Sequence, residues 1–192
     1  MKSPSEKGPK SFSRLMIAAV PLSIWLCTPA SVLGQSSGCV LVPDDRKPSE
    51  KILRCGSNLT IRSAPNTAYR LTNPDKRRQP DGARLDSGAL LIEFTPNESQ
   101  RDFRILTPQA ITAVRGTRWA VEVGPSQTST LVISGSVEVT QRNSRRGAAP
   151  GVRESAVLGA GEGVDVSAGT GPIVVGRWAQ TRIDALMARF GQ

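Results

Sequence analysis

Alternating apolar and polar residues predict β-strands along most of the chain after residue 38. The clearest alternation closes the stretch 105–123, where Trp119, Val121 and Val123 fall on one side. A period of two residues is typical of a half-buried strand. Similar short runs predict further strands at 39–42, 52–55, 58–62, 88–94, 130–134, 136–141, 156–158 and 163–166.

Glycines mark the places where these apolar runs are interrupted. Gly116 separates two strand-like runs, which predicts a bend, a bulge or a close backbone approach. The runs on either side of Gly135 predict a β-hairpin, because glycine supplies the positive φ of a tight turn. The same strand–glycine–strand pattern recurs at Gly88 and Gly161. The intervals between these glycines along the chain are unequal, so a solenoid is not predicted. The expected fold is all-β, a rolled or sandwiched sheet of short antiparallel strands.

The period changes at the C-terminal end of the chain, in residues 176–192. Ile183, Leu186, Met187 and Phe190 follow the spacing of one helical face. We therefore expect a short C-terminal α-helix that covers an open end or an edge of the sheet. A helix that docks a partner or lies on a membrane surface is the alternative.

Composition narrows the possible functions. The 192 residues include 18 glycines, 14 prolines and only 4% aromatics, which favours a turn-rich β fold. The chain has no histidine, so imidazole bases, histidine metal ligands and histidine-dependent triads are excluded. Four carboxylates lie in or beside predicted strands and leave a glycosidase-like pair as an alternative: Glu122, Glu138, Glu162 and Asp165. Of these, Glu122 and Glu138 face away from the apolar side. We expect no enzyme activity, no cofactor and no metal.

The first 34 residues have the order of a secretory signal peptide. Residues 1–14 are basic and polar, Leu15–Cys27 is apolar, and small residues precede Gln35. The apolar run is shorter than the roughly 20 residues of a spanning helix. An uncleaved anchor is the competing interpretation, and the expected location is periplasmic or secreted. The formal net charge of +9 indicates a solvated basic surface, and no nucleic-acid partner is expected.

Two cysteines remain after the leader, and they predict a disulfide. Cys39 and Cys55 form an even pair in a chain expected to be exported. Closing their loop would stabilise the fold by about 3 kcal/mol. Two cysteines without histidine are too few for a metal site, and the spacing of a redox pair is absent.

Several spaced motifs follow one another within roughly residues 82–166. They begin with Thr107-Pro108 and continue through Val114-Arg115-Gly116-Thr117, Trp119 and the alternating valines. They go on to the run around Gly135 and end at the strand pair around Gly161. In this order they resemble the FecR domain. The resemblance implies a periplasmic domain that senses or relays a signal through protein contacts, often with an outer-membrane receptor and an anti-sigma segment.

Two residues of these motifs allow more than one role. The guanidinium of Arg115 would fork onto backbone carbonyls or onto a carboxylate such as Glu122 or Glu162, and so hold the bend at Gly116. Trp119 lies on the valine side of its strand, which favours a core position, and a binding aromatic is the alternative.

We expect four segments in the chain. They are a signal peptide at 1–34, a disulfide-tied β segment at 35–78, a FecR-like β domain at 79–168, and a tail with an amphipathic helix at 169–192. Because only a short stretch precedes the apolar run, we expect no cytoplasmic regulatory domain. The expected function is a non-enzymatic module for protein interaction or signal sensing, whose partner is another envelope protein.

A cell-wall or glycan-binding module is the alternative function. Residues 59–70 resemble the opening strand and turn of bacterial Src-homology-type small barrels, which bind cell-wall peptides. The net positive charge is compatible with a cell-wall polymer as partner. Too little chain follows before residue 82 to complete such a barrel.

Overall fold

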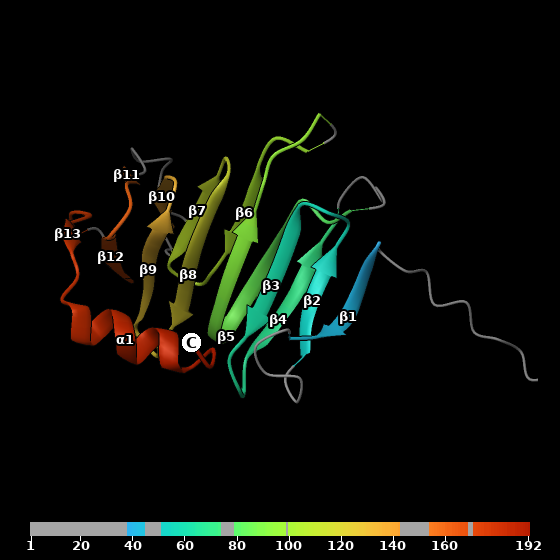
Figure 1. The fold of residues 1–192 in the computed structure, drawn as a ribbon. Coiled ribbons are helices and arrows are strands. Elements are labelled where there is room, and N and C mark those ends of the chain that lie inside the picture. Colours follow the sequence, from blue (N-terminus) through green and yellow to red (C-terminus); the bar gives the residue numbers. More distant parts are fainter. Residues whose placement is uncertain (1–37, 45–50, 74–78, 99, 143–153, 169–170) are drawn as a thin grey trace, which may run out of the picture. The chain divides into compact units, whose positions relative to one another are not determined.

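The computed structural model describes residues 38–44, 51–73, 79–98, 100–142, 154–168 and 171–192. The predicted signal peptide at 1–34 lies outside these residues. Strands dominate the described chain, and one helix, α1 (Gln180–Ala188), follows them near the C-terminus (Figure 1). The predicted all-β class with a short C-terminal helix is therefore confirmed. In the described residues, no helix has both the length and the apolar character needed to span a membrane.

The strands form two layers that share one long strand, β5 (Gly82–Phe94). Layer A has the order β1 (Cys39–Pro43), β2 (Lys51–Cys55), β3 (Leu59–Ser63), β5, β8 (Thr117–Val123), β9 (Gln127–Ser134), β12 (Glu162–Ser167) and β13 (Val175–Arg177). Layer B has the order β4 (Ala68–Thr72), β5, β6 (Phe103–Leu106), β7 (Ala110–Val114), β10 (Val137–Gln141) and β11 (Ser155–Leu158).

β5 passes from layer B to layer A at Gly88. Its first half pairs with β4 and β6, and its second half pairs with β3 and β8. Gly88 has φ +86°, and a Cβ there would lie 2.6 Å from the Cα of Thr67. Only glycine fits both the conformation and the contact, so it lets one strand serve both layers.

The pair β5–β6 is parallel, which corrects the expectation of antiparallel strands throughout. The other pairs of described strands are antiparallel. Because β5 folds at Gly88, its two ends return toward the same edge. The chain after Phe94 therefore re-enters layer B beside Gly82, and Arg104 becomes the partner of Gly82. The rings of Phe94 and Phe103, 5.9 Å apart, lie at this crossing.

The predicted hairpin at Gly135 is wrong. β9 pairs with β8 and β12 in layer A, whereas β10 pairs with β7 and β11 in layer B. The short connection carries the chain across the core instead of back along the same layer. A similar crossing separates β3 from β4, which do not pair with each other. The strand-turn-strand figure at 59–70 is thus not the hairpin of a small barrel.

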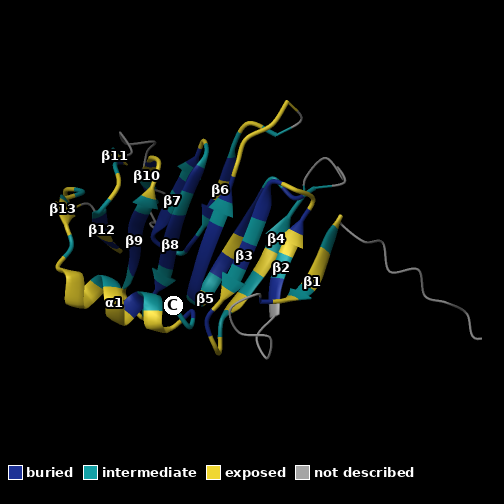
Figure 2. Cartoon of the chain, viewed as in Figure 1, coloured by how far each residue is buried: buried dark blue, intermediate teal, exposed yellow. Residues whose placement is uncertain are grey.

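The apolar core lies between the two layers, where the buried residues gather (Figure 2). Trp119 and Phe103 are fully buried there, with ring centroids 6.4 Å apart in an edge-on arrangement. The predicted disulfide between Cys39 and Cys55 is confirmed, and it joins opposite residues of β1 and β2.

Helix α1 covers the outer face of layer A, not an end or an edge of the sheet. Leu186 and Phe190 pack with small and aliphatic residues that point away from the main core: Ala64, Ala89, Leu91, Ala120 and Leu131. Arg182 pairs with Asp165 of β12 at 2.6 Å, and Arg189 pairs with Glu122 of β8. Layer A has apolar residues on both faces, and the second apolar face needs a cover, which explains the position of the helix.

Candidate functional site

Three glycine corners lie side by side along one edge of the fold, which we call the corner edge. Gly116 joins β7 to β8, Gly135 joins β9 to β10, and Gly161 joins β11 to β12. Each corner carries the chain from one layer to the other, and their φ angles are +81°, +85° and +80°. Their strands are neighbours in both layers, so the corners stack in the same order.

Close backbone contacts hold the corner edge together. A Cβ on Gly135 would lie 2.4 Å from the carbonyl oxygen of Gly116. The hydroxyl of Thr117 donates to the carbonyl oxygen of Ser136 at 2.8 Å, and the N–H of Gly161 donates to Val132 at 2.8 Å. The motif residues Gly116, Thr117, Gly135 and Gly161 therefore form one structural unit, although they are far apart in the sequence.

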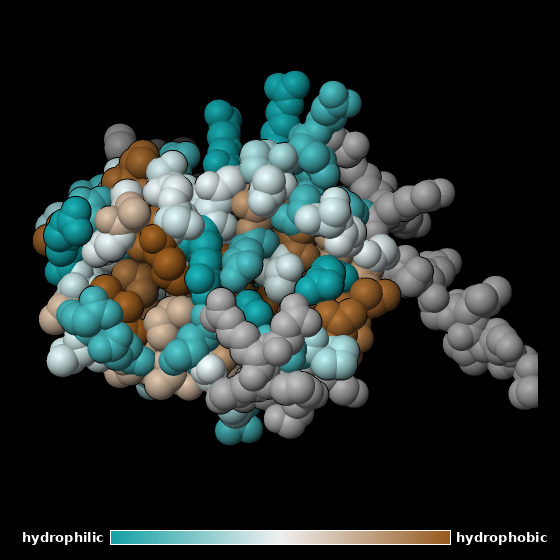
Figure 3. Space-filling model, viewed as in Figure 1, coloured by the Kyte–Doolittle hydropathy of each residue, from teal (hydrophilic) through white to brown (hydrophobic). Residues whose placement is uncertain are grey.

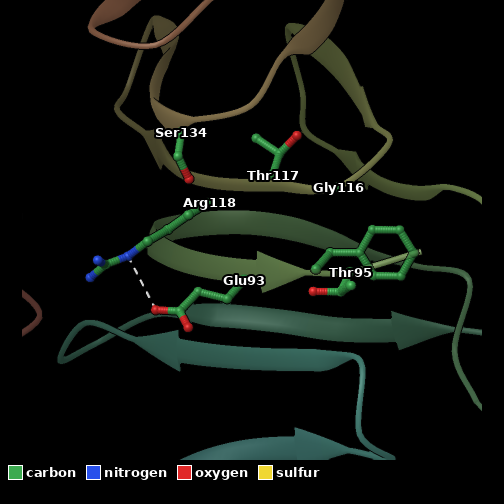
Figure 4. A pocket seen from close by; sticks show the side chains of 7 residues that line it. Glu93, Thr95, Gly116, Thr117, Arg118 and Ser134 are labelled. Atoms are coloured by element: carbon green, nitrogen blue, oxygen red, sulfur yellow. Dashed lines mark ion pairs between the residues drawn. The ribbon is translucent and has the colours of Figure 1, made fainter. Parts of the chain in front are cut away.

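A shallow groove of about 430 Å³ opens beside the first corner (Figure 4). It is lined by Glu93, Phe94, Thr95, Gly116, Thr117, Arg118 and Ser134. Thr95 and Ser134 are exposed, whereas Phe94 and Thr117 are buried. The groove thus presents hydroxyl and charged groups and no exposed aromatic ring.

A chain of ion pairs runs from the groove across layer A. Arg118 and Glu93 are directly opposite each other on β8 and β5, with 3.1 Å between Nε and Oε1. Glu93 also contacts Arg62 at 3.4 Å, and Arg62 pairs with the buried Asp44 at 2.7 Å. Arg118 further donates to the side chain of Gln192, beyond α1. The groove is therefore linked to both the β1 side of layer A and the C-terminal segment.

Thr107 and Pro108 lie at the opposite end of the fold from the corner edge, because β7 separates them from Gly116. The Thr107 hydroxyl accepts from the N–H of Ala110 and donates to its carbonyl, both at 2.9 Å. Thr128 of layer A places its Oγ1 2.8 Å from Thr107 Oγ1 and 2.7 Å from Gln109 Oε1. This part of the motif closes the β6–β7 turn and ties the two layers together.

Arg115 does not hold the bend at Gly116. Its side chain is exposed and contributes to a second groove, of about 520 Å³, on the outer face of layer B. The carboxylates expected as its partners bind other groups: Glu122 binds Arg189, and Glu162 accepts from the N–H of Gly159 at 2.7 Å. The bend is maintained by backbone packing at the corner edge, where the glycine itself supplies the close approach.

The remaining motif residues belong to the core. Val114 and Trp119 are buried between the layers, so Trp119 is a core residue and not a binding aromatic. Sequence reasoning missed Glu93, Thr95 and Ser134 as groove residues. The charge of Glu93 within the apolar run 88–94 was the signal available in the sequence. Its partner, Arg118, is identified only by the pairing of β5 with β8.

Glu122 and Glu138 do not form a catalytic pair. Glu122 lies on the outer face of layer A, and Glu138 lies on the outer face of layer B, so the whole core separates them. Burial raises the pKa of Asp165, but hydrogen bonds from Arg182 and Ser129 outweigh burial and hold that pKa below its usual value. Within the described residues, no three metal-ligating side chains gather at one place.

Comparisons with known proteins agree with the motifs. The family described as FecR protein matches residues 48–138. The match starts well before residue 82 and includes β2 to β5, but it ends before the corner at Gly161. No curated protein matches the chain.

Two crystal structures of a protein described as a candidate anti-sigma factor from Parabacteroides distasonis ATCC 8503 are similar to this chain. One has a TM-score of 0.48 at 18% identity, covering 78% of this chain and 59% of that chain. The other has a TM-score of 0.48 at 16% identity, covering 79% and 61%. The chain thus spans about three fifths of their length.

Proposed function

We propose that this chain, in which the family described as FecR protein matches residues 48–138, is a non-enzymatic module that binds a protein partner in bacterial envelope signalling. The family match is the observation that carries this proposal. It covers the strands that build the groove beside Gly116. A partner that binds there would contact the backbone of the first corner and the charged pair Glu93–Arg118.

The chemistry of the groove favours a polar protein segment over a sugar. The lining offers hydroxyl groups and a paired carboxylate and guanidinium, which suit backbone amides and polar side chains. Phe94, the aromatic residue of the lining, is only 3% exposed and leaves no ring for a sugar to stack on. Cell-wall or glycan binding therefore stays the second candidate.

The lack of histidine in the sequence supports the non-enzymatic part of the proposal. Without histidine, an activated serine would need another base. Asp165 and Glu122 pair with arginines, Glu162 accepts from a backbone N–H, and Glu138 lies on the opposite side of the core from Glu122. Export to the envelope rests on the predicted leader at 1–34 and is part of the proposal.

The test is capture of partners from envelope fractions by the tagged chain. Ser134→Arg fills the groove with a long side chain at an exposed position, and we expect it to abolish capture. Ser155→Arg, the same change at an exposed position on β11, is the control and should capture as well as the wild type. Retention on isolated cell-wall polymer, with no protein captured, would contradict the proposal and favour glycan binding.

A further inference from the structure

The edge strand β1 is the least protected edge of the fold. It carries the sequence Cys-Val-Leu-Val-Pro without a charge, and among the described strands it pairs only with β2. Val40 and Leu41 are 57% and 65% exposed. Figure 3 shows hydrophobic side chains on the surface over β1. Uncharged apolar edge strands readily pair with another strand.

The other edges of the two layers carry the usual protection. β13 has three residues and includes Arg177, and β11 has four residues. β4 carries Arg70, which pairs with Asp86 of β5 at 2.9 Å. Short length and edge charges are the features by which proteins block unwanted strand pairing. β1 is longer than two of these edge strands and lacks the charge of the third.

The register of β1 and β2 shows which backbone groups point outward. The N–H of Gly56 donates to the carbonyl of Gly38 at 3.2 Å, which makes Gly38 and Gly56 a hydrogen-bonded pair. Such pairs alternate along an antiparallel ladder. Counting along the register, Val40 is bonded to Arg54, whereas Leu41 and Leu53 form a pair without mutual hydrogen bonds. The N–H and C=O of Leu41 therefore point away from β2.

The side chain of Leu41 also lies on an uncovered side of the sheet. Leu41 is opposite Leu53, which is opposite Ile61 of the main core, so all three lie on the inner side of layer A. Layer B ends at β4 and does not extend over β1. A further strand beside β1 would bring its own side chains next to Leu41 and continue the apolar inner side.

We propose that two copies of this chain pair through β1, antiparallel about a twofold axis at Leu41. Leu41 of each copy then donates its N–H to the carbonyl of the other copy's Leu41, and the two exposed leucine side chains cover each other. Val40 of one copy faces Val42 of the other, and no like charges meet on the strand. Pro43 has no N–H and ends the pairing on each side.

The disulfide favours this pairing because it keeps the edge strand in place. Cys39 is bonded to Cys55 of β2, so β1 cannot fray from the sheet at that end. A strand that is already ordered loses less conformational entropy when it binds. The pairing joins the two copies of layer A into one continuous sheet and does not depend on the proposed function.

The test is the oligomeric state of the full chain by sedimentation, up to about 1 mM because a short edge contact gives modest affinity. We expect a concentration-dependent dimer. Leu41→Lys places like charges opposite each other, and Leu41→Pro removes the outward N–H without removing a hydrogen bond to β2. Both should be monomers with an unchanged circular dichroism spectrum. Val157→Lys, at a valine of β11 that is 69% exposed, should still dimerise.

Cysteine cross-linking checks the register. A mixture of Val40→Cys and Val42→Cys chains should give a disulfide-linked dimer. Val40→Cys alone should not, because position 40 of each copy is opposite Val42 of the other copy. A wild-type monomer at every concentration would overturn the proposal. A dimer that persists in Leu41→Lys, or one lost equally in Val157→Lys, would overturn it as well.

Discussion

Single atoms decide the geometry of the corner edge. At Gly135 the position of a Cβ is occupied by the carbonyl oxygen of Gly116, and the positive φ adds to the strain of any side chain. At Gly116 the nearest atom to a Cβ is Cδ of Pro96, at 3.1 Å, so the overlap would be smaller than at Gly135. The two corners therefore differ in how much they tolerate a side chain.

Gly135→Ala should lower the free energy of unfolding by about 2–3 kcal/mol, because the new methyl group meets fixed backbone in a left-handed conformation. Urea unfolding followed by circular dichroism measures the change. Gly176→Ala is the control, because a Cβ there has open space within 4 Å, and its stability should match the wild type. Equal stability of the two variants would show that the corner is not constrained.

Buried hydroxyl groups give a second test at this scale. The hydroxyl of Thr107 has partners on Ala110, whereas the buried hydroxyl of Thr112 has none among the described residues. Valine has nearly the same shape as threonine but no hydroxyl. Thr107→Val should therefore lower the free energy of unfolding by about 1–3 kcal/mol.

Thr112→Val should leave the free energy of unfolding unchanged or raise it, because it removes a buried polar group without a partner. Both variants are measured by the same urea unfolding experiment. A larger loss for Thr112→Val than for Thr107→Val would contradict the hydrogen-bond assignment at the β6–β7 turn.

At the scale of elements, helix α1 depends on the sheet that it covers. It has nine residues, and no side chain caps its N-terminus. Isolated helices of this length are unstable in water, so packing on layer A and the pairs of Arg182 and Arg189 must hold it. Arg182 also stacks over the ring of Trp178, 3.5 Å from its centroid.

The pH dependence of stability tests the attachment of α1. The folded-state pKa of Asp165 lies below its usual value of 3.8. Its contribution to stability is therefore fully present above that value and is lost as the pH falls from there through the lower folded-state pKa. Between about pH 6 and about pH 3, Asp165→Asn should lose less stability than the wild type.

Asp184→Asn is the matched control for this experiment. Its carboxylate accepts from Gln180 of the same helix and not from the sheet, so this variant keeps the pair between Asp165 and Arg182. Thermal unfolding across the pH range measures both variants. If Asp165→Asn and the wild type lose stability in parallel, the pair between Asp165 and Arg182 does not fasten the helix.

At the scale of the whole molecule, the described strands from β1 to β13 share one continuous hydrogen-bonded network. β3 of the disulfide-tied segment pairs with β5, so the segment extends layer A instead of forming a unit of its own. The family match begins at residue 48, so it includes β2, β3 and β4 of this segment but not β1. The disulfide therefore strengthens the outermost pair of a shared sheet.

Export is a whole-molecule prediction that depends on the leader. Protein produced in a bacterial host and recovered from outside the cytoplasm should begin at Gln35, because cleavage follows the small residues that end at Gly34. Intact-mass measurement of the purified chain identifies the first residue and the disulfide together. A mass equal to that of all 192 residues would indicate an uncleaved anchor.

The strands and the helix face were predictable because they depend on local periodicity. Trp119, Val121 and Val123 alternate whatever lies opposite them, and the spacing of Leu186 and Phe190 indicates a helix without reference to the sheet. The two cysteines likewise indicated their bond, since only one pair remained after the leader. Glycine positions were also visible, and four of them became the crossings between layers.

Only the tertiary structure decided how these elements pair. The same glycine pattern is compatible with a hairpin within one layer or with a crossing between the two layers. At Gly135 the chain crosses between the layers and packs against the backbone of the neighbouring corner at Gly116. The partners of Glu122 and Glu93 come from strands and a helix far away in the sequence, so no local pattern could assign them. Periodicity determines which face of an element is apolar, whereas long-range packing determines what covers that face.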